Sequence, residues 1–171
     1  EPYLCGQRGR LFGMPAKVFL DRDGLVQRVL SESQSLAFSC SSSTEVSRTL
    51  SKALAGAHEV VRRARRGELH YAQSLLDELR SHMARLDGWL QGFEPAAPHD
   101  LKLASRLSPA LREVFARSYV GLDAIELDQA VVALGQALTQ QIPQLHQKFD
   151  LGRSLDADLL AVELVTQRQV A

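Results

Sequence analysis

Apolar residues recur at steps of three and four along most of the chain beyond residue 45. This spacing puts them on one face of an α-helix, and each such face must be covered by another helix. The stripes run through residues 46–64, 69–93, 127–149 and 155–165. The sequence therefore predicts a mainly α fold, an antiparallel up-and-down helical bundle.

The start of the first expected helix carries a capping signal. Ser42 and Glu45 have the capping-box spacing, in which the two side chains bond to backbone N–H groups at a helix start. The first stripe stops at Gly67, and the second ends before Pro95 and Pro98. The first two helices are expected to form a hairpin or one kinked rod.

The second half of the bundle is expected to begin with a short helical stretch at residues 101–107. A longer helix follows from Pro109, which suits a first turn, to Gly121. Pro143 interrupts the stripe at 127–149 and is expected to kink or split that helix. Ser154 is a suitable cap for the final helix.

The N-terminal residues have a different pattern. Extended runs at 3–5 and 16–20 are separated by glycines, which predicts a β-hairpin segment over residues 1–30. Two strands alone bury too little to be stable, so further strands are expected, and the chain, which begins without Met, is expected to be a fragment. The serine-rich residues 31–43 are expected to be a linker, followed by the bundle domain at 44–171.

Composition narrows the class of protein. Twenty basic residues balance twenty acidic ones, so no overall charge attracts nucleic acid. No apolar run approaches the roughly 20 residues of a membrane-spanning helix. Cys5 and Cys40 match neither a metal-ligand spacing nor a disulfide framework, which favours free thiols and a cytoplasmic location.

Three groups of residues could carry chemistry. Asp21 and Asp23 have a spacing that can hold Mg²⁺, although Gly24 directly after them favours an ordinary turn. No role is assigned to the isolated histidines at positions 58, 82 and 146. The junction at residues 65–72 crowds arginines, Glu68, an imidazole and a phenol around Gly67, and composition alone favours a solvated helix joint there.

The segment at residues 60–72, followed by Leu75-Leu76, resembles the C-terminal helical domain of antibiotic nucleotidyltransferases, and the lincosamide nucleotidyltransferases are the nearest comparison. The resemblance covers roughly residues 46–166, and its specific motif is Arg66-Gly67-Glu68-Leu69 with Tyr71. It implies a bundle of the nucleotidyltransferase substrate-binding type, preceded by the end of an α/β palm. The implied function is binding of an acceptor, a small hydroxylated molecule such as an antibiotic, which receives a nucleotidyl group from an NTP. Arg66, Glu68, His70 and Tyr71 are the implied substrate-binding residues.

Two departures from that family concern catalysis. The family's Gly-Ser motif with its downstream Asp-x-Asp is absent from this sequence. The position at which the family carries its third carboxylate corresponds to about Ala16, which is not an acidic residue. Nucleotidyl transfer needs a carboxylate-held metal ion, so this chain is expected to contain no catalytic residue, metal site or cofactor. Mg²⁺ and NTP are expected of a longer parent protein.

Two other functions remain open. Arg65 and His70 have the spacing seen in HEPN-type helical ribonucleases, which would act on RNA. The bundle could instead serve only dimerisation or partner binding. A homodimer is expected in any case, because Leu75 and Leu160 widen the apolar faces beyond one seam.

Overall fold

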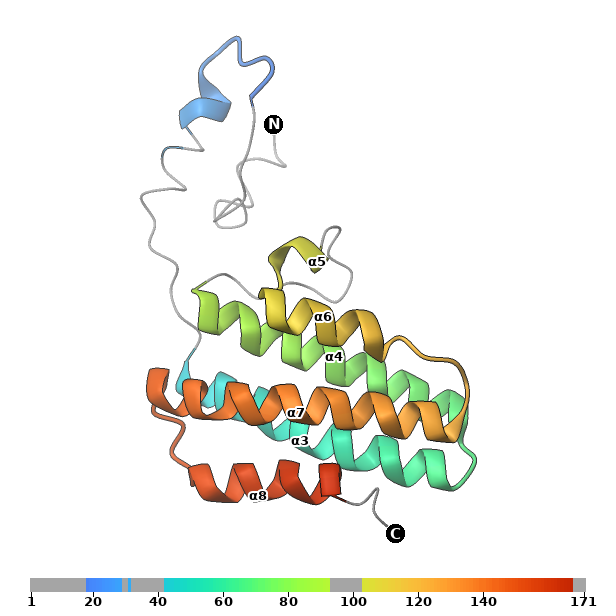
Figure 1. Cartoon of the computed structure of the whole chain (residues 1–171). Coiled ribbons are helices and arrows are strands. Elements are labelled where there is room, and N and C mark those ends of the chain that lie inside the picture. Colours follow the sequence, from blue (N-terminus) through green and yellow to red (C-terminus); the bar gives the residue numbers. More distant parts are fainter. Residues whose placement is uncertain (1–17, 29–30, 32–41, 93–102, 168–171) are drawn as a thin grey trace. The chain divides into compact units, whose positions relative to one another are not determined.

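The computed structural model describes residues 18–28, 31, 42–92 and 103–167 (Figure 1). The chain divides into two compact units, a smaller one of Glu1–Cys40 with Gly92–Glu94 and a larger one of Ser41–Gln91 with Pro95–Ala171. The larger unit contains the helices α3 (Ser43–Arg65), α4 (Leu69–Gln91), α5 (Leu103–Arg106), α6 (Pro109–Ser118), α7 (Ala124–Lys148) and α8 (Leu155–Thr166). The described chain is mainly helical, as the apolar periodicity predicts.

The smaller unit differs from the expected hairpin wherever it is described. Residues 18–20, the end of the second expected strand, are not in a strand, and residues 25–28 are helical. Asp21 explains the helical turn, because its carboxylate accepts hydrogen bonds from the N–H groups of Val26 (3.2 Å) and Gln27 (2.8 Å). This aspartate therefore caps a turn, as its position before Gly24 suggests. The first expected strand, residues 3–5, lies outside the described residues.

Helices α3 and α4 lie side by side and are joined by the turn at residues 66–68 (Figure 1). Ser42 caps α3 by accepting from the Glu45 N–H at 3.3 Å. The other half of the capping box does not form, because the Glu45 carboxylate pairs with Arg85 of α4 at 2.8 Å. A side chain that could cap its own helix thus links two helices instead.

The link from α4 to α6 is fixed by a buried carboxylate. α4 ends at Gln91, and the last residue of its expected stripe lies outside the described residues. The short α5 lies within the expected stretch, and α6 begins at Pro109 as predicted but ends at Ser118, three residues before Gly121. Asp87 of α4 accepts from the Ser108 N–H at 2.8 Å, which holds the start of α6 against α4.

Helix α7 runs unbroken through Pro143, so the expected split does not occur. Asp123 caps its start by accepting from two backbone N–H groups, and Ser154 caps α8 through the Ala157 N–H at 3.3 Å. At the other end of α7, the Lys148 ammonium donates to the carbonyls of Trp89 (2.9 Å) and Leu90 (2.8 Å). These bonds satisfy acceptors that the last turn of α4 leaves without an intrahelical partner.

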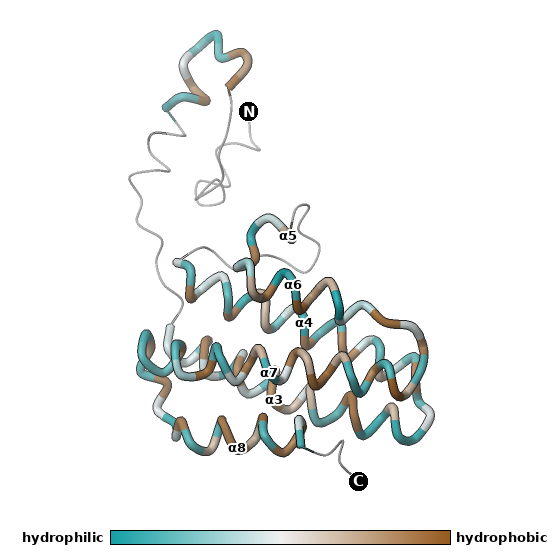
Figure 2. Tube along the Cα trace, viewed as in Figure 1, coloured by the Kyte–Doolittle hydropathy of each residue, from teal (hydrophilic) through white to brown (hydrophobic). Residues whose placement is uncertain are grey.

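The core lies between α3, α4 and α7, which contact one another. α8 packs on α3 and α7, whereas α6 packs on α7 and α4. Apolar and hydrophilic segments alternate along each helix, as a one-sided stripe requires (Figure 2). The largest fully buried side chains are Trp89, Leu50, Leu76, Leu79, Met83, Leu86, Leu127, Leu134, Leu138, Ile142, Leu145 and Val46. Among the described helices, none is long and apolar enough to cross a membrane.

A polar cluster, here called the α8 network, joins α8 to the rest of the bundle. Asp158 is only 1% exposed and accepts from His146 of α7 at 2.9 Å. The same carboxylate is held by Arg153, which also donates to the Ser47 carbonyl of α3 at 3.3 Å. His58 of α3 contacts a backbone carbonyl of α8 at 2.9 Å. Two of the isolated histidines are therefore packing residues, as their lack of a second ligand suggests.

Candidate functional site

The joint between α3 and α4 is a tight turn centred on Gly67. This residue has a φ of +75°, in the left-handed region that glycine adopts without strain. The Gly67 N–H donates to the Ala64 carbonyl at 3.0 Å, and the Glu68 N–H donates to the Arg63 carbonyl at 3.1 Å. The turn ends α3 and places Glu68 at the start of α4, where its carbonyl accepts from the Ala72 N–H at 2.9 Å.

Arg63 is the centre of the polar joint. Its guanidinium donates to Glu59 at 2.6 Å and to Glu68 at 2.6 Å, so it bridges the end of α3 and the start of α4. It also lies 4.7 Å from the centre of the Tyr71 ring, a cation–π distance. Arg62 adds a second cation to Glu59 at 2.6 Å. We call these five residues the joint network.

The electrostatics of the joint network follow from these bonds. Hydrogen bonds from Arg62 and then Arg63 lower the pKa of Glu59 to about 2. Bonding to the carboxylates raises the pKa of both arginines, through Glu59 for Arg62 and first through Glu68 for Arg63. Both glutamates are thus already matched with cations before any ligand arrives.

The four residues implied by the family resemblance are not equivalent in the structure. Glu68 and Tyr71 meet at Arg63, with the Glu68 side chain 38% exposed and Tyr71 50% exposed. Arg66 and His70 are also exposed, but their side chains form no hydrogen bond or ion pair with the described residues. Glu68 and Tyr71 are therefore brought together by Arg63, whereas Arg66 and His70 lie exposed on the rim of the turn.

The residues of the ribonuclease hypothesis lie on opposite sides of the same turn. Arg65 is the last residue of α3, and His70 is the second residue of α4. Both are exposed. Arg65 lines a shallow hollow with residues at the start of α7, among them Ile125 and Asp128.

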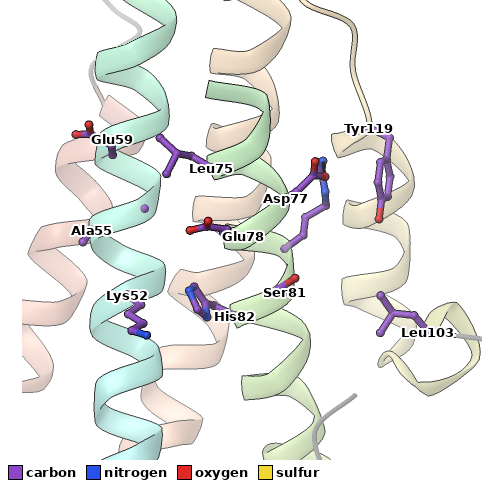
Figure 3. Close-up of a pocket in the computed structure, with 12 residues that line it drawn as sticks. Lys52, Ala55, Glu59, Leu75, Asp77, Glu78, Ser81, His82, Leu103 and Tyr119 are labelled. Atoms are coloured by element: carbon purple, nitrogen blue, oxygen red, sulfur yellow. Dashed lines mark hydrogen bonds and ion pairs between the residues drawn. The ribbon is translucent and has the colours of Figure 1, made fainter. Parts of the chain in front are cut away.

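A second feature, which the sequence analysis did not find, is a groove along the outer side of α3, α4, α5 and α6. Its volume is about 1030 Å³, close to the upper end of the volumes of typical small-molecule sites, roughly 300–1,000 Å³ (Figure 3). We call it the α4 groove. It is lined by Lys52, Ala55, Gly56, Glu59, Leu75, Asp77, Glu78, Arg80, Ser81, His82, Leu103 and Tyr119.

The polar side chains of the α4 groove come mainly from α4 itself. Glu78 and His82, four residues apart, extend from α4 toward α3 (Figure 3). Lys52 and Glu59 of α3 also line the groove. Asp77 lies on the side of α4 that faces Tyr119. Glu59 belongs to both the groove and the joint network, so the two features are continuous.

One wall of the α4 groove is held by a buried arginine. Arg80 is 3% exposed and donates to Asp77 at 2.5 Å and to the Ser118 carbonyl at 2.6 Å. Its guanidinium lies 4.1 Å from the centre of the Tyr119 ring. Arg80 therefore ties the end of α6 to α4 and orients Tyr119 along the groove.

His82 is the titratable group of the groove whose pKa is shifted. Burial, and then the charges of Lys52 and Arg85, lower the pKa of its imidazole. Its Nδ1 is buried and has no hydrogen-bond partner among the described residues. A neutral imidazole can accept a hydrogen bond from a hydroxyl group through its unprotonated ring nitrogen. His82 was assigned no role from sequence, and its four-residue spacing from Glu78 is the signal that could have identified it.

The described residues do not include a group of three or more His, Cys, Asp or Glu side chains that could hold a metal ion. No protein-family model and no curated protein matches this sequence.

Proposed function

We propose that the helical unit binds a small, hydroxylated, singly cationic molecule in the α4 groove, as the acceptor-binding part of a nucleotidyltransferase-like protein. One observation carries the proposal: Glu78 and His82 face the same open groove, a carboxylate beside a neutral imidazole. A carboxylate attracts an ammonium group, and an imidazole nitrogen accepts from a hydroxyl. Amino sugars and similar antibiotics carry both groups.

The charge of the groove supports a single positive charge on the ligand. Its lining contains the carboxylates of Glu59, Asp77 and Glu78 and the cations Lys52 and Arg80, an excess of one negative charge. Two of the carboxylates are already paired, with Arg62 and Arg63 or with Arg80. Glu78 forms no hydrogen bond or ion pair with a described residue, so it is the carboxylate best suited to a ligand ammonium.

The joint network adjoins the proposed site through Glu59, which belongs to both. Glu68 is already bonded to Arg63, so we assign it the role of holding this arginine. Arg63 in turn holds Glu59 at the groove wall and stacks on Tyr71. Arg66 and His70 belong to the same rim and would contact only a ligand that extends beyond the groove.

The rest of the proposed protein follows from the family resemblance. Glu45 near the start of α3 meets Arg85 near the end of α4, and Arg63 near the end of α3 meets Tyr71 near the start of α4, which supports an antiparallel up-and-down bundle. A palm with the metal-binding carboxylates would supply Mg²⁺ and NTP in a longer parent. We propose that the protein is cytoplasmic and forms a homodimer. The dimer is supported by Leu160 on α8, an apolar side chain that is 55% exposed.

The proposal is tested by titrating lincomycin, a hydroxylated monocation, into the ¹⁵N-labelled chain and following amide chemical shifts. Binding in a half-built site should have a Kd of roughly 1 mM. Glu78→Gln should weaken it about fivefold, the scale of one partly exposed charged hydrogen bond. Glu113→Gln, on the exposed face of α6 outside the groove, is the matched control and should change the Kd by less than about twofold.

Absence of saturable shifts, or equal weakening by Glu78→Gln and Glu113→Gln, would refute the assignment. The parent activity is tested separately, by incubating the chain with Mg²⁺-ATP and the acceptor. The chain alone should give no nucleotidylated product, because the palm motif that holds the metal is absent from its sequence. A product would direct attention back to Asp21 and Asp23.

A second function rests on the exposure of Arg65 and His70 on either side of one turn. An exposed arginine and an exposed histidine beside one turn could act on an RNA phosphodiester, the arginine binding the phosphate and the histidine transferring a proton. The purified chain would then cleave single-stranded RNA, and His70→Ala would abolish cleavage without loss of helicity. No cleavage by the unmodified chain would remove this function.

A further inference from the structure

A second pocket lies on another side of the larger unit, between α4, α6 and α7. It has a volume of about 650 Å³. Its apolar walls come from α4, α6 and α7, through Leu90, Leu111, Val114, Ala133 and Ala137. The two alanines lie four residues apart on α7, and their small side chains leave open the space that larger residues would fill between α6 and α7.

Glutamine side chains supply much of the polar lining, so we call this space the glutamine pocket. Gln136, Gln140 and Gln144 follow one another at four-residue steps along α7, and Gln141 lies beside Ala137. Gln144 donates to the Gln140 carbonyl at 2.9 Å and is exposed. The pocket therefore has an uncharged, hydrogen-bonding side along α7.

Gln141 differs from the other glutamines because it is buried. It is 7% exposed, and its Oε1 has no hydrogen-bond partner among the described residues. A buried polar atom without a partner destabilises a protein, so such atoms usually find one. Asp87, which lines the same pocket and is buried too, accepts from both Gln91 (2.7 Å) and the Ser108 N–H (2.8 Å). Among the described buried polar side-chain atoms of residues that line this pocket, Oε1 of Gln141 is therefore the atom left without a partner.

The lining indicates the chemistry of a ligand. Asp87 is already satisfied by two donors, and Arg117 bonds to a backbone carbonyl of its own helix, so neither requires a charged ligand. A carboxamide pairs in its plane with a partner that carries a donor beside an acceptor, as glutamine does with the edge of a base. The apolar walls suit the faces of a flat ring.

We infer that the glutamine pocket binds an uncharged planar heteroaromatic amide or a similar ring with adjacent donor and acceptor groups, which pairs with the carboxamide of Gln141. This site is separate from the α4 groove, and it does not depend on the function proposed there. Rotation of the last side-chain torsion of Gln141 selects which end of the carboxamide meets the ligand.

The test is an NMR titration of the full chain with nicotinamide, a pyridine ring carrying a carboxamide, followed by the side-chain amide signal of Gln141 and the methyl signals of Leu111 and Val114. We expect saturable shifts of these signals with a Kd in the millimolar range, the affinity of a small fragment. Nicotinate has the same ring and an anionic carboxylate that cannot donate, and it should bind at least about fivefold more weakly.

Two variants distinguish loss of the hydrogen bonds between Gln141 and the ligand from loss of folding. Gln141→Leu keeps the side-chain volume and removes the unsatisfied polar group, so the chain should remain folded, which its thermal unfolding checks. This variant should weaken nicotinamide binding at least about tenfold. Gln147→Leu, on an exposed position of α7 outside the pocket, should leave the Kd within about twofold.

Three results would overturn the inference: no saturable shift with nicotinamide, equal affinity for nicotinate, or binding by Gln141→Leu within twofold of the unmodified chain. Lincomycin provides a further control, because its binding in the α4 groove should not shift the Gln141 signal.

Discussion

The joint network and the α8 network both hold a carboxylate against an arginine, and they differ in how much water reaches the pair. The Glu68 side chain at the joint is 38% exposed, whereas Asp158 in the α8 network is 1% exposed. A solvated ion pair contributes little to stability and can exchange partners, while breaking a buried pair leaves charges without compensation. The comparison separates polar residues that are available to a ligand from those that hold helices together.

The largest expected change in the free energy of unfolding comes from the buried α8 network. Asp158→Ala should lower the free energy of unfolding by about 3 kcal/mol, because Arg153 and His146 lose the acceptor they share. Urea denaturation measures the change. Asp156→Ala, at an exposed position in the first turn of the same helix, should cost less than about 1 kcal/mol. Equal costs for the two variants would contradict the structural role of Asp158.

Substitution of alanine for each of two glycines tests the same contrast between exposed and buried parts of the bundle. Gly56 in α3 borders the α4 groove, and a Cβ added there meets nothing within 4 Å, so Gly56→Ala should stabilise the helix by about 0.5–1 kcal/mol. At Gly135 in α7 an added Cβ would lie 2.7 Å from the Thr166 side chain of α8. Overpacking costs about 1–3 kcal/mol, so Gly135→Ala should be destabilising overall.

Thermal unfolding of both variants measures the difference, which we expect to be about 2 kcal/mol. A stabilising Gly135→Ala would mean that α8 does not pack closely on α7, and the buried side of the comparison would then be wrong.

The helices could be predicted from sequence because their signals are local. The three- and four-residue steps and the caps predicted at Ser42 and Ser154 lie within single segments, and both caps are confirmed. The strand expected at residues 16–20 is wrong in its described part. The carboxylate of Asp21, beyond the extended run, bonds to the backbone of a helical turn instead.

The candidate site depends on long-range contacts and was therefore only partly predictable. Glu68 and Tyr71 lie within ten residues of the arginine that joins them, and the sequence analysis singled out both. The α4 groove requires Tyr119 to reach Arg80, 39 positions earlier in the printed sequence, and no local pattern reports that contact. Gln141 is an ordinary polar residue by sequence, and its burial is visible only after folding.

A smaller change in stability is expected from the joint network when the pH is lowered. The pKa of Glu59 is depressed from 4.5 to about 2, so its ionised form is favoured by folding, and the resulting stability is present above pH 4.5. This contribution should be lost as the pH falls from 4.5 to 2, and it should be weakened by salt because the pair is solvated.

Thermal unfolding between pH 5 and pH 2, with Glu59→Gln as the comparison, measures this effect. The difference between the two chains should shrink across the window and should be smaller in high salt. A difference that does not change with pH would show that Arg62 and Arg63 do not stabilise the ionised form of Glu59.

The central claim is that the exposed α4 groove, and not the buried α8 network, receives a ligand. A residue-by-residue map of amide shifts on titration with lincomycin tests it most directly. The account predicts saturable shifts concentrated at residues 52–59 and 75–82 and at Tyr119, with the signals of His146, Arg153 and Asp158 unchanged. Saturable shifts centred on the α8 network, or none at the groove at ligand concentrations well above the expected Kd, would contradict it.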